Sequence, residues 1–188
     1  MKETPEYTKK SKYPSVTEVL SPWNDYSHVP EDRLEAAAER GTAVHAYCAA
    51  YARGVWAPTP PPGFRGYVDS FQRWFDLFVD ETLVCEEEIE DAMLGYCGHP
   101  DLCVRAGKLG GVILTDLKTP IALKRRIWGC QLSAYERLLI GLGVKPDRVG
   151  SLQLSPEGRA ARFEDFSEDL QEYFKAFFSA LNCHKFFK

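Results

Sequence analysis

The stretch GVILTDLKT at residues 111–119 decides the fold of this chain. Its run of apolar and β-branched residues predicts a strand over 111–118. A short glycine-bearing turn at 106–110 precedes this strand, so the sequence predicts a hairpin between 94–105 and 111–118. A further strand is predicted over 82–90. Three consecutive strands therefore form the centre of the predicted fold.

Helices are predicted before and after these strands. Ser15 and Glu18 have the spacing of a capping box, which predicts a short helix over 15–20. Acidic residues follow Pro30 and predict a longer helix that reaches Tyr51. The remaining elements follow from helical spacing or from alternation of apolar residues. They are a proline-rich connection over 54–66, helices over 67–80 and 127–142, strands over 149–154 and 161–166, and a last helix capped by Ser167.

This order of elements predicts an α/β fold with one mixed central β-sheet flanked by helices. The 188 residues fit a single domain, predicted over 15–188, and the polar residues 1–14 are expected to form a flexible arm. Hydrophobic residues make up 45% and charged residues 27% of the chain, which is typical of globular domains and excludes disorder. No apolar run approaches the roughly 20 residues that cross a membrane, and the first residues, MKETPEYTKK, do not resemble a signal peptide. We therefore expect a cytoplasmic protein with no membrane partner.

Charge is unevenly distributed along the chain. The formal net charge of −4 argues against a protein that coats nucleic acid by bulk charge. Residues 76–91 nevertheless contain eight acids and no bases, whereas residues 117–137 contain five bases and one acid. Acidic and basic segments in one small domain are typical of a metal site beside a track for phosphates. Two differently solvated faces would give the same pattern.

The residues best suited to chemistry are Asp101, Asp116 and Lys118. Asp116 and Lys118 lie two apart on a predicted strand, so their side chains share one face. Asp101 lies on the neighbouring strand of the hairpin, where its carboxylate can share a divalent cation such as Mg²⁺ or Mn²⁺ with Asp116. A lysine beside such an ion can orient or deprotonate a water, and the set is typical of metal-assisted phosphodiester hydrolysis. Ordinary exposed strand residues would show the same D-x-K spacing.

Five motifs follow one another in the order found in one nuclease family. They are G-x-x-x-H at 41–45, the glutamates at 86–88, G-x-x-D at 98–101, D-x-K-T at 116–119 and Q-x-x-x-Y at 131–135. On these motifs, residues 15–140 resemble the PD-(D/E)XK nuclease superfamily. The resemblance is to its RecB-type exonuclease branch, which includes many phage and CRISPR-adaptation nucleases. It implies a restriction-endonuclease-like core.

The resemblance also implies a metal centre with one or two Mg²⁺ or Mn²⁺ ions. Its ligands would be His45, Asp101, Asp116 and the backbone carbonyl of Leu117. The catalytic residues would be Asp101, Asp116, Lys118 and Glu86. Lys118 would position the attacking water and stabilise the developing charge. Glu86, favoured over Glu87 and Glu88, would bind or orient a second metal or a water.

Further residues are expected to support the strands or to contact DNA. By the resemblance, Gln131 would help to hold the active-site strands, and Tyr135 would contact the DNA backbone or pack beside it. Three basic residues directly after the D-x-K strand are expected to grip phosphates: Lys124, Arg125 and Arg126. Trp128 is close enough to offer a stacking surface for an unpaired base. A solvated helix start with one core tryptophan is an equal alternative.

The cysteines define an alternative kind of site. No C-x-x-C pair occurs among the six cysteines, so we expect reduced thiols. Cys97, His99 and Cys103 alternate along a predicted strand and would share one face with Asp101, which makes a zinc site conceivable. Several relatives in the nuclease branch carry an iron–sulfur cluster on one early and three late cysteines. Only Cys183 follows Cys130 here, so no cluster is expected.

The sequence therefore predicts a metal-dependent deoxyribonuclease, an exonuclease rather than an endonuclease. By resemblance, its substrate would be DNA with free ends in bacterial or phage recombination, repair or processing. The chain contains no P-loop, so unwinding would require a recombination or helicase partner. Two alternatives remain open. One is a catalytically silent module that binds DNA or a partner protein on the same fold, and the other is a zinc-binding interaction protein.

Overall fold

The computed structural model describes residues 11–27, 29–119 and 123–188, so most of the expected N-terminal arm lies outside the described residues. The α-helices are α1 (Val16–Leu20), α2 (Glu31–Ala52), α3 (Pro62–Phe78), α4 (Arg125–Gly141) and α5 (Leu170–Phe187). The strands are β1 (Glu81–Val84), β2 (Ile89–Asp91), β3 (Tyr96–Gly98), β4 (Leu102–Ala106), β5 (Gly111–Lys118), β6 (Arg148–Gln153) and β7 (Arg162–Asp165). Within the described ranges, no helix is long and apolar enough to cross a membrane.

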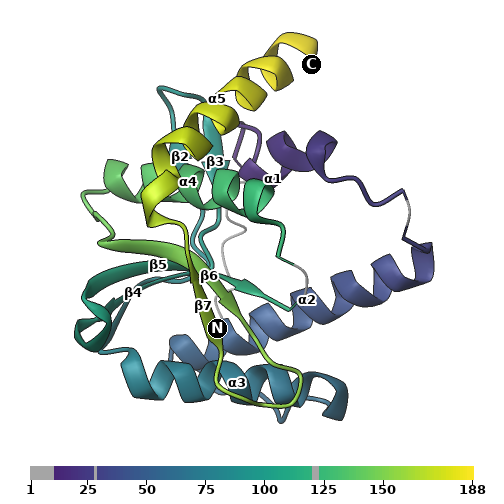
Figure 1. Ribbon diagram of the computed structural model, residues 1–188, viewed down its shortest axis with the longest axis vertical. Coiled ribbons are helices and arrows are strands. Elements are labelled where there is room, and N and C mark those ends of the chain that lie inside the picture. Colours follow the sequence, from purple (N-terminus) through teal and green to yellow (C-terminus); the bar gives the residue numbers. More distant parts are fainter. Residues whose placement is uncertain (1–10, 28, 120–122) are drawn as a thin grey trace, which may run out of the picture.

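A five-stranded mixed sheet forms the centre of the molecule, in the order β1-β4-β5-β6-β7. Strands β5 and β6 are parallel and are connected through α4, whereas the other neighbours in this sheet are antiparallel. Strands β2 and β3 form a separate antiparallel pair. Figure 1 shows α4 and α5 above the central sheet and α2 and α3 below it. The predicted α/β fold with a mixed sheet flanked by helices is confirmed.

The central strand β5 supplies both hydrophobic cores because its side chains alternate between the faces of the sheet. Ile113 and Leu117 are buried in the cluster that includes residues of α2 and α3. Leu114 is buried in the other cluster, with residues of α1, α4 and α5. The polar end of β5, from Asp116 to Lys118, therefore lies between two layers of helices.

The predicted helix starts are confirmed for α1 and α2 and need correction for α3 and α5. Ser15 accepts a hydrogen bond from the backbone N–H of Glu18 at 3.1 Å, as a capping residue does. Helix α3 begins at Pro62, inside the expected connection, because proline needs no hydrogen bond at the first helical position. Ser167 does not cap α5. Its hydroxyl accepts from the N–H of Val149, and a 3₁₀ turn over Ser167–Asp169 precedes the helix.

Two predicted strands are each broken in two. The stretch 82–90 forms β1 and β2 in different sheets, because the backbone of Glu86 is left-handed, with φ of 51°. The stretch 94–105 forms β3 and β4, which end and begin on either side of Pro100, a residue without an N–H for the ladder. The expected hairpin between β4 and β5 is confirmed, with Leu102 opposite Thr115.

Candidate metal centre

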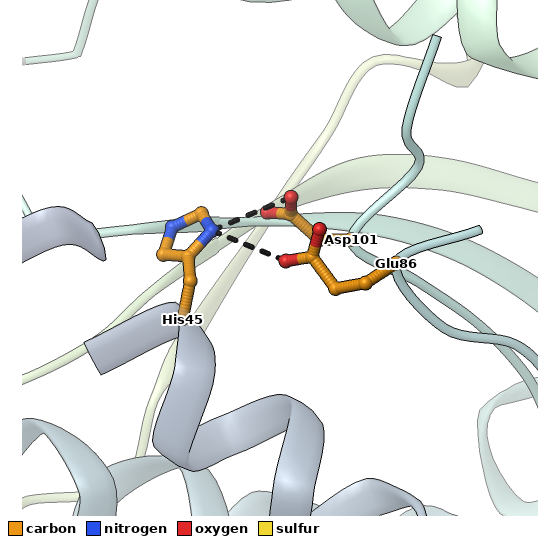
Figure 2. Close-up of side chains that lie close together, drawn as sticks. All are labelled: His45, Glu86 and Asp101. Atoms are coloured by element: carbon orange, nitrogen blue, oxygen red, sulfur yellow. Dashed lines mark ion pairs between the residues drawn. The ribbon is translucent and has the colours of Figure 1, made fainter. Parts of the chain in front are cut away.

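Three side chains that can bind a metal meet at one end of the central sheet (Figure 2). His45 lies on α2, Glu86 follows β1 by two residues, and Asp101 directly precedes β4. His45 Nδ1 lies 3.4 Å from Asp101 Oδ1 and 3.7 Å from Glu86 Oε1. One potential ligand atom from each residue lies within 4.8 Å of the others. The arrangement thus brings together three of the residues predicted from sequence.

The left-handed turn at Glu86 is fixed from two directions. The N–H of Glu86 faces the carbonyl oxygens of Pro100 at 3.0 Å and of Asp101 at 3.3 Å. From the other direction, the guanidinium of Arg53 donates to the carbonyls of Cys85 and Glu86. Arg53 was not among the residues predicted for the site. It lies directly after α2, and its partners are backbone carbonyls, so no pattern in the sequence identifies it.

The end of β5 joins this group through the backbone of Leu117. The N–H of Leu117 donates to Asp101 Oδ2 at 2.6 Å. His45 Nε2 lies 3.0 Å from the Leu117 carbonyl oxygen and donates to it when that nitrogen carries a proton. The Asp116 carboxylate is buried and forms an ion pair with Lys118. The structure therefore brings together three of the four expected ligand groups, His45, Asp101 and the Leu117 carbonyl. The Asp116 carboxylate is not part of the group of His45, Glu86 and Asp101 and pairs with Lys118 beside it.

Lys118 is linked to α4 by a chain of hydrogen bonds. Its ammonium group donates to Gln131 Oε1 at 3.1 Å, and Gln131 Nε2 donates to the hydroxyl of Tyr135 at 3.2 Å. Tyr135 is only 4% exposed and lies against Gly98, where a Cβ atom would be 2.6 Å from its ring. Tyr135 therefore packs beneath the site and does not present its ring to a ligand. The motifs at 98–101 and 131–135 are therefore in contact, through Gly98 and Tyr135.

Burial and the charges of neighbouring residues raise the pKa values of His45 and Asp116 and lower that of Asp101. Burial opposes a charge on His45, but the carboxylates of Asp101 and Glu86 outweigh it and raise the pKa of the imidazole to about 11. Burial also disfavours the charged form of Asp101, yet His45 and Lys118 hold the pKa of Asp101 below its ordinary value. Burial and the neighbouring charge of Asp101 raise the pKa of Asp116. The site is thus a cluster of acids with two cationic neighbours.

The other two glutamates of the acidic cluster do not join this group. Glu88 pairs with His99 at 3.1 Å, and Glu87 is exposed. Glu86 is therefore the member of the cluster that faces His45.

The alternation that suggested a zinc site is wrong, because β3 ends at Gly98 and β4 begins at Leu102. Cys97 contacts the carbonyl of Tyr13, and Cys103 is buried in the core. In the part of the chain that the structure describes, groups of three or more possible ligands occur only at His45, Glu86 and Asp101.

The residues expected to contact DNA after β5 are largely engaged within the protein. Trp128 is 5% exposed and packs in the core, so the alternative of a core tryptophan is confirmed and the expected stacking surface is wrong. Arg125 pairs with Glu164 at 2.9 Å, and Lys124 lies 3.7 Å from the ring centre of Tyr26. Arg126 lines a groove between α4 and α5. These basic residues therefore do not form one free track, because two of the three already have partners.

No model of a known protein family matches this chain. A comparison with curated proteins also found no match. The assignment of a function therefore rests on the residues of the chain itself.

Proposed function

We propose that this chain is a metal-dependent deoxyribonuclease of the PD-(D/E)XK type. The observation that supports it is the convergence of His45, Glu86 and Asp101 beside the Asp116–Lys118 ion pair. These residues come from separate segments and meet at the end of a buried strand. Carboxylates and an imidazole that can hold a divalent cation, with a lysine beside them, are compatible with metal-assisted hydrolysis of a phosphodiester.

The donor set fits a hard divalent cation. Carboxylate and carbonyl oxygens are the preferred ligands of Mg²⁺ and Mn²⁺, and the imidazole of His45 is more compatible with Mn²⁺. The candidate ligands are His45, Asp101, Asp116 and the carbonyl of Leu117, with Glu86 available to a second ion or a water. One or two bound ions would supply an acidified water and a positive charge for the phosphate oxygens.

The protein's own contribution centres on Lys118. Its ammonium group is held between the Asp116 carboxylate and the amide oxygen of Gln131, so its position relative to the carboxylates is fixed. From there it can orient a water by a hydrogen bond and stabilise negative charge that develops on the phosphate. Gln131 and Tyr135 act indirectly, by holding Lys118 in place.

We further propose that the enzyme is an exonuclease acting on DNA with free ends. The described ranges contain a five-stranded sheet, a two-stranded sheet and helices, and no separate element for reading a sequence has been found within them. Recombination, repair or DNA processing in a bacterial or phage-infected cell, with a recombination or helicase partner, is the corresponding biological proposal. It follows from the sequence resemblance alone.

The test is a time course on end-labelled linear and covalently closed circular DNA, with Mg²⁺, Mn²⁺ or EDTA. We expect metal-dependent loss of linear DNA while circles are spared, and about 10²- to 10⁴-fold slower cleavage by Lys118→Met. Lys175→Met, at an exposed position on α5, is the matched control and should cut normally. Circular dichroism establishes that each variant is folded.

Each other outcome has a defined meaning. Cleavage of circles would show an endonuclease. A folded protein that binds DNA and cuts none of it would contradict the proposed enzyme and identify a silent binding module. Cleavage by Lys118→Met at the parental rate would contradict the role proposed for Lys118.

A further inference from the structure

We infer that the groove between α4 and α5 is a self-association surface, which binds the α5 helix of a second copy of this chain. The inference goes beyond the proposed function and does not depend on it. The groove has a volume of about 520 Å³. Its wall on α5 is formed by Ala176, Ser179, Ala180 and Cys183. The facing walls include Ile127 of α4 and Trp23, which lies in the 3₁₀ turn after α1.

The wall on α5 continues into two exposed aromatic residues. Phe186 is 82% and Phe187 is 81% exposed. They follow Cys183 by three and four residues, so they lie on the same face of the helix as the wall. Their rings are in contact, with centres 5.0 Å apart. Figure 1 shows this end of α5 projecting beyond the rest of the molecule, so the two rings stand in solvent next to an apolar groove.

One face of α5 therefore carries both a recess and a projection. In a two-fold symmetric pair, both copies use the same surface, so a recess on one copy can receive the projection of the other. The phenylalanine pair of each copy would lie against the wall between Ala176 and Cys183 of the other. The two α5 helices would then run antiparallel. Trp23, which is 51% exposed at the groove, would be covered by the same contact.

The charges of α5 favour this antiparallel arrangement. Exposed acids lie in the 3₁₀ turn before the helix and in its first turn: Glu168, Asp169 and Glu172. Exposed bases lie in its last turn and directly after it: Lys185 and Lys188. An antiparallel pair places the acidic start of each helix beside the basic end of the other, whereas a parallel pair would oppose like charges. Within the chain, Glu172 and Lys188 take part only in exposed ion pairs, which contribute little and leave both groups accessible.

The exposed aromatic surface is close to the size that a specific interface needs. From the exposed fractions of Trp23, Phe186 and Phe187, two copies would bury roughly 600–1,100 Å² of aromatic surface, at about 150–250 Å² for a whole side chain. A specific interface buries at least about 1,000 Å² in total, which these residues and the apolar lining of the groove reach together. An interface at this lower limit should have a Kd in the micromolar range.

Sedimentation velocity over a series of protein concentrations tests the association. We expect a dimer at about 100 µM that dissociates on dilution. Ala176→Glu puts a charge into the wall of the groove from an exposed position and should raise the Kd at least about tenfold, because an unpaired charge is costly to bury. Phe187→Ser removes part of the projection and should have a similar effect. Asn182→Glu makes the same change of charge at an exposed position of α5 outside the groove, so it is the matched control and should associate like the parent. Circular dichroism establishes that each variant is folded.

Cross-linking tests the orientation of the two helices. In Ala176→Cys, oxidation by copper phenanthroline should join the introduced thiol to Cys183 of the other copy and give a covalent dimer. The two positions are seven residues apart on one helix, about 10 Å, which is too far for a disulfide within one copy. Adding Cys183→Ser to this variant should abolish the covalent dimer.

Three results would overturn the inference. The first is a monomer at every concentration, and if such a monomer binds anilinonaphthalene sulfonate less well after Ala176→Glu, the groove takes an apolar ligand instead. The second is a dimer that Ala176→Glu and Phe187→Ser leave unchanged, which would place the contact on another surface. The third is a dimer weakened by both variants that gives no covalent product from Ala176→Cys, which would refute the antiparallel pairing of α5.

Discussion

Arg53 connects two of the segments that form the candidate metal centre. It caps the end of α2, the helix that carries His45, and donates to the backbone of the turn at Cys85 and Glu86. That turn requires a left-handed conformation at Glu86, which is unfavourable for a residue with a Cβ atom. Arg53 therefore stabilises the conformation that directs the Glu86 carboxylate towards His45.

We expect Arg53→Lys to weaken Mn²⁺ binding by about 10- to 100-fold, as is usual for residues that orient metal ligands. A lysine carries one compact ammonium group and cannot reproduce the planar fork of arginine. Isothermal titration with Mn²⁺ measures the effect. Arg65→Lys on the exposed face of α3 is the control, and equal affinities in the two variants would contradict the role assigned to Arg53.

At the scale of single elements, α2 contains a glycine where a helix does not need one. Gly41 lies inside α2, and a Cβ atom added there would meet nothing within 4 Å. The residue lines a cavity beside His45. Its small size therefore affects the cavity rather than the packing of the helix.

We expect Gly41→Ala to stabilise the protein by up to about 1 kcal/mol, because alanine is the better helix former. In a chain of this length, the melting temperature should rise by about 2–4 °C. Differential scanning calorimetry measures the change. A lower melting temperature would show that the backbone of α2 at Gly41 needs the freedom of glycine.

The edge strand β7 is held to β6 by a partly exposed carboxylate. Arg148 donates two hydrogen bonds to Asp165, at 2.9 and 2.8 Å. Burial favours the neutral form of Asp165, but hydrogen bonds from Ser167 and Arg148 outweigh it and lower its pKa below the ordinary value of 3.8. A lowered pKa means that Asp165 stabilises the folded state above pH 3.8 and that this contribution is lost as the pH falls through the folded pKa.

We therefore expect Asp165→Asn to lower the free energy of unfolding by about 0.5–1 kcal/mol at neutral pH, a value reduced by solvent screening. The difference from the parent should shrink as the pH is lowered below 3.8. Urea denaturation at several pH values measures it. Glu168→Gln, at an exposed carboxylate nearby, should show no such trend, and a pH-independent cost of Asp165→Asn would point to packing instead of charge.

Local signals predicted the helices better than the breaks between strands. The Ser15 cap and the acids after Pro30 act within one turn, so α1 and α2 could be located from the sequence. The break at Glu86 has no glycine to indicate it. It depends on Arg53 and on the carbonyls of Pro100 and Asp101, which are distant in sequence.

The residues of the candidate site that belong to local motifs could also be predicted from the sequence. His45, Asp101 and Asp116 belong to motifs with fixed spacing, and the hairpin placed Asp101 near Asp116. The sequence could not decide between the stacking role and the core position expected for Trp128, because its burial depends on how α4 packs against α1 and α5. Arg53 escaped notice because its partners are backbone carbonyls, which leave no pattern in the sequence.

At the scale of the whole molecule, the candidate ligands belong to segments that meet only in the folded chain. His45, Glu86 and Asp101 come from a helix and from two strand ends. An ion that binds this group binds the native state in preference to the unfolded chain. Its binding free energy is then added to the stability of the fold.

We expect Mn²⁺ to raise the melting temperature relative to EDTA, with a stabilisation of about 2.7 kcal/mol at an ion concentration 100 times the Kd. Asp101→Asn should remove most of this increase, because it takes away one ligand. Differential scanning fluorimetry over a series of Mn²⁺ concentrations measures both effects. An equal increase in the parent and in Asp101→Asn would show that the ion binds elsewhere.

The position of β5 has a consequence for the newly made chain. This strand lies between β4, which precedes it, and β6, which is synthesised only after α4. On the ribosome, Asp116 and Lys118 therefore emerge before the strand that flanks them on one side exists. The central strand gains both neighbours only when translation has passed Gln153, so the candidate site at the end of β5 is completed late in synthesis of the chain.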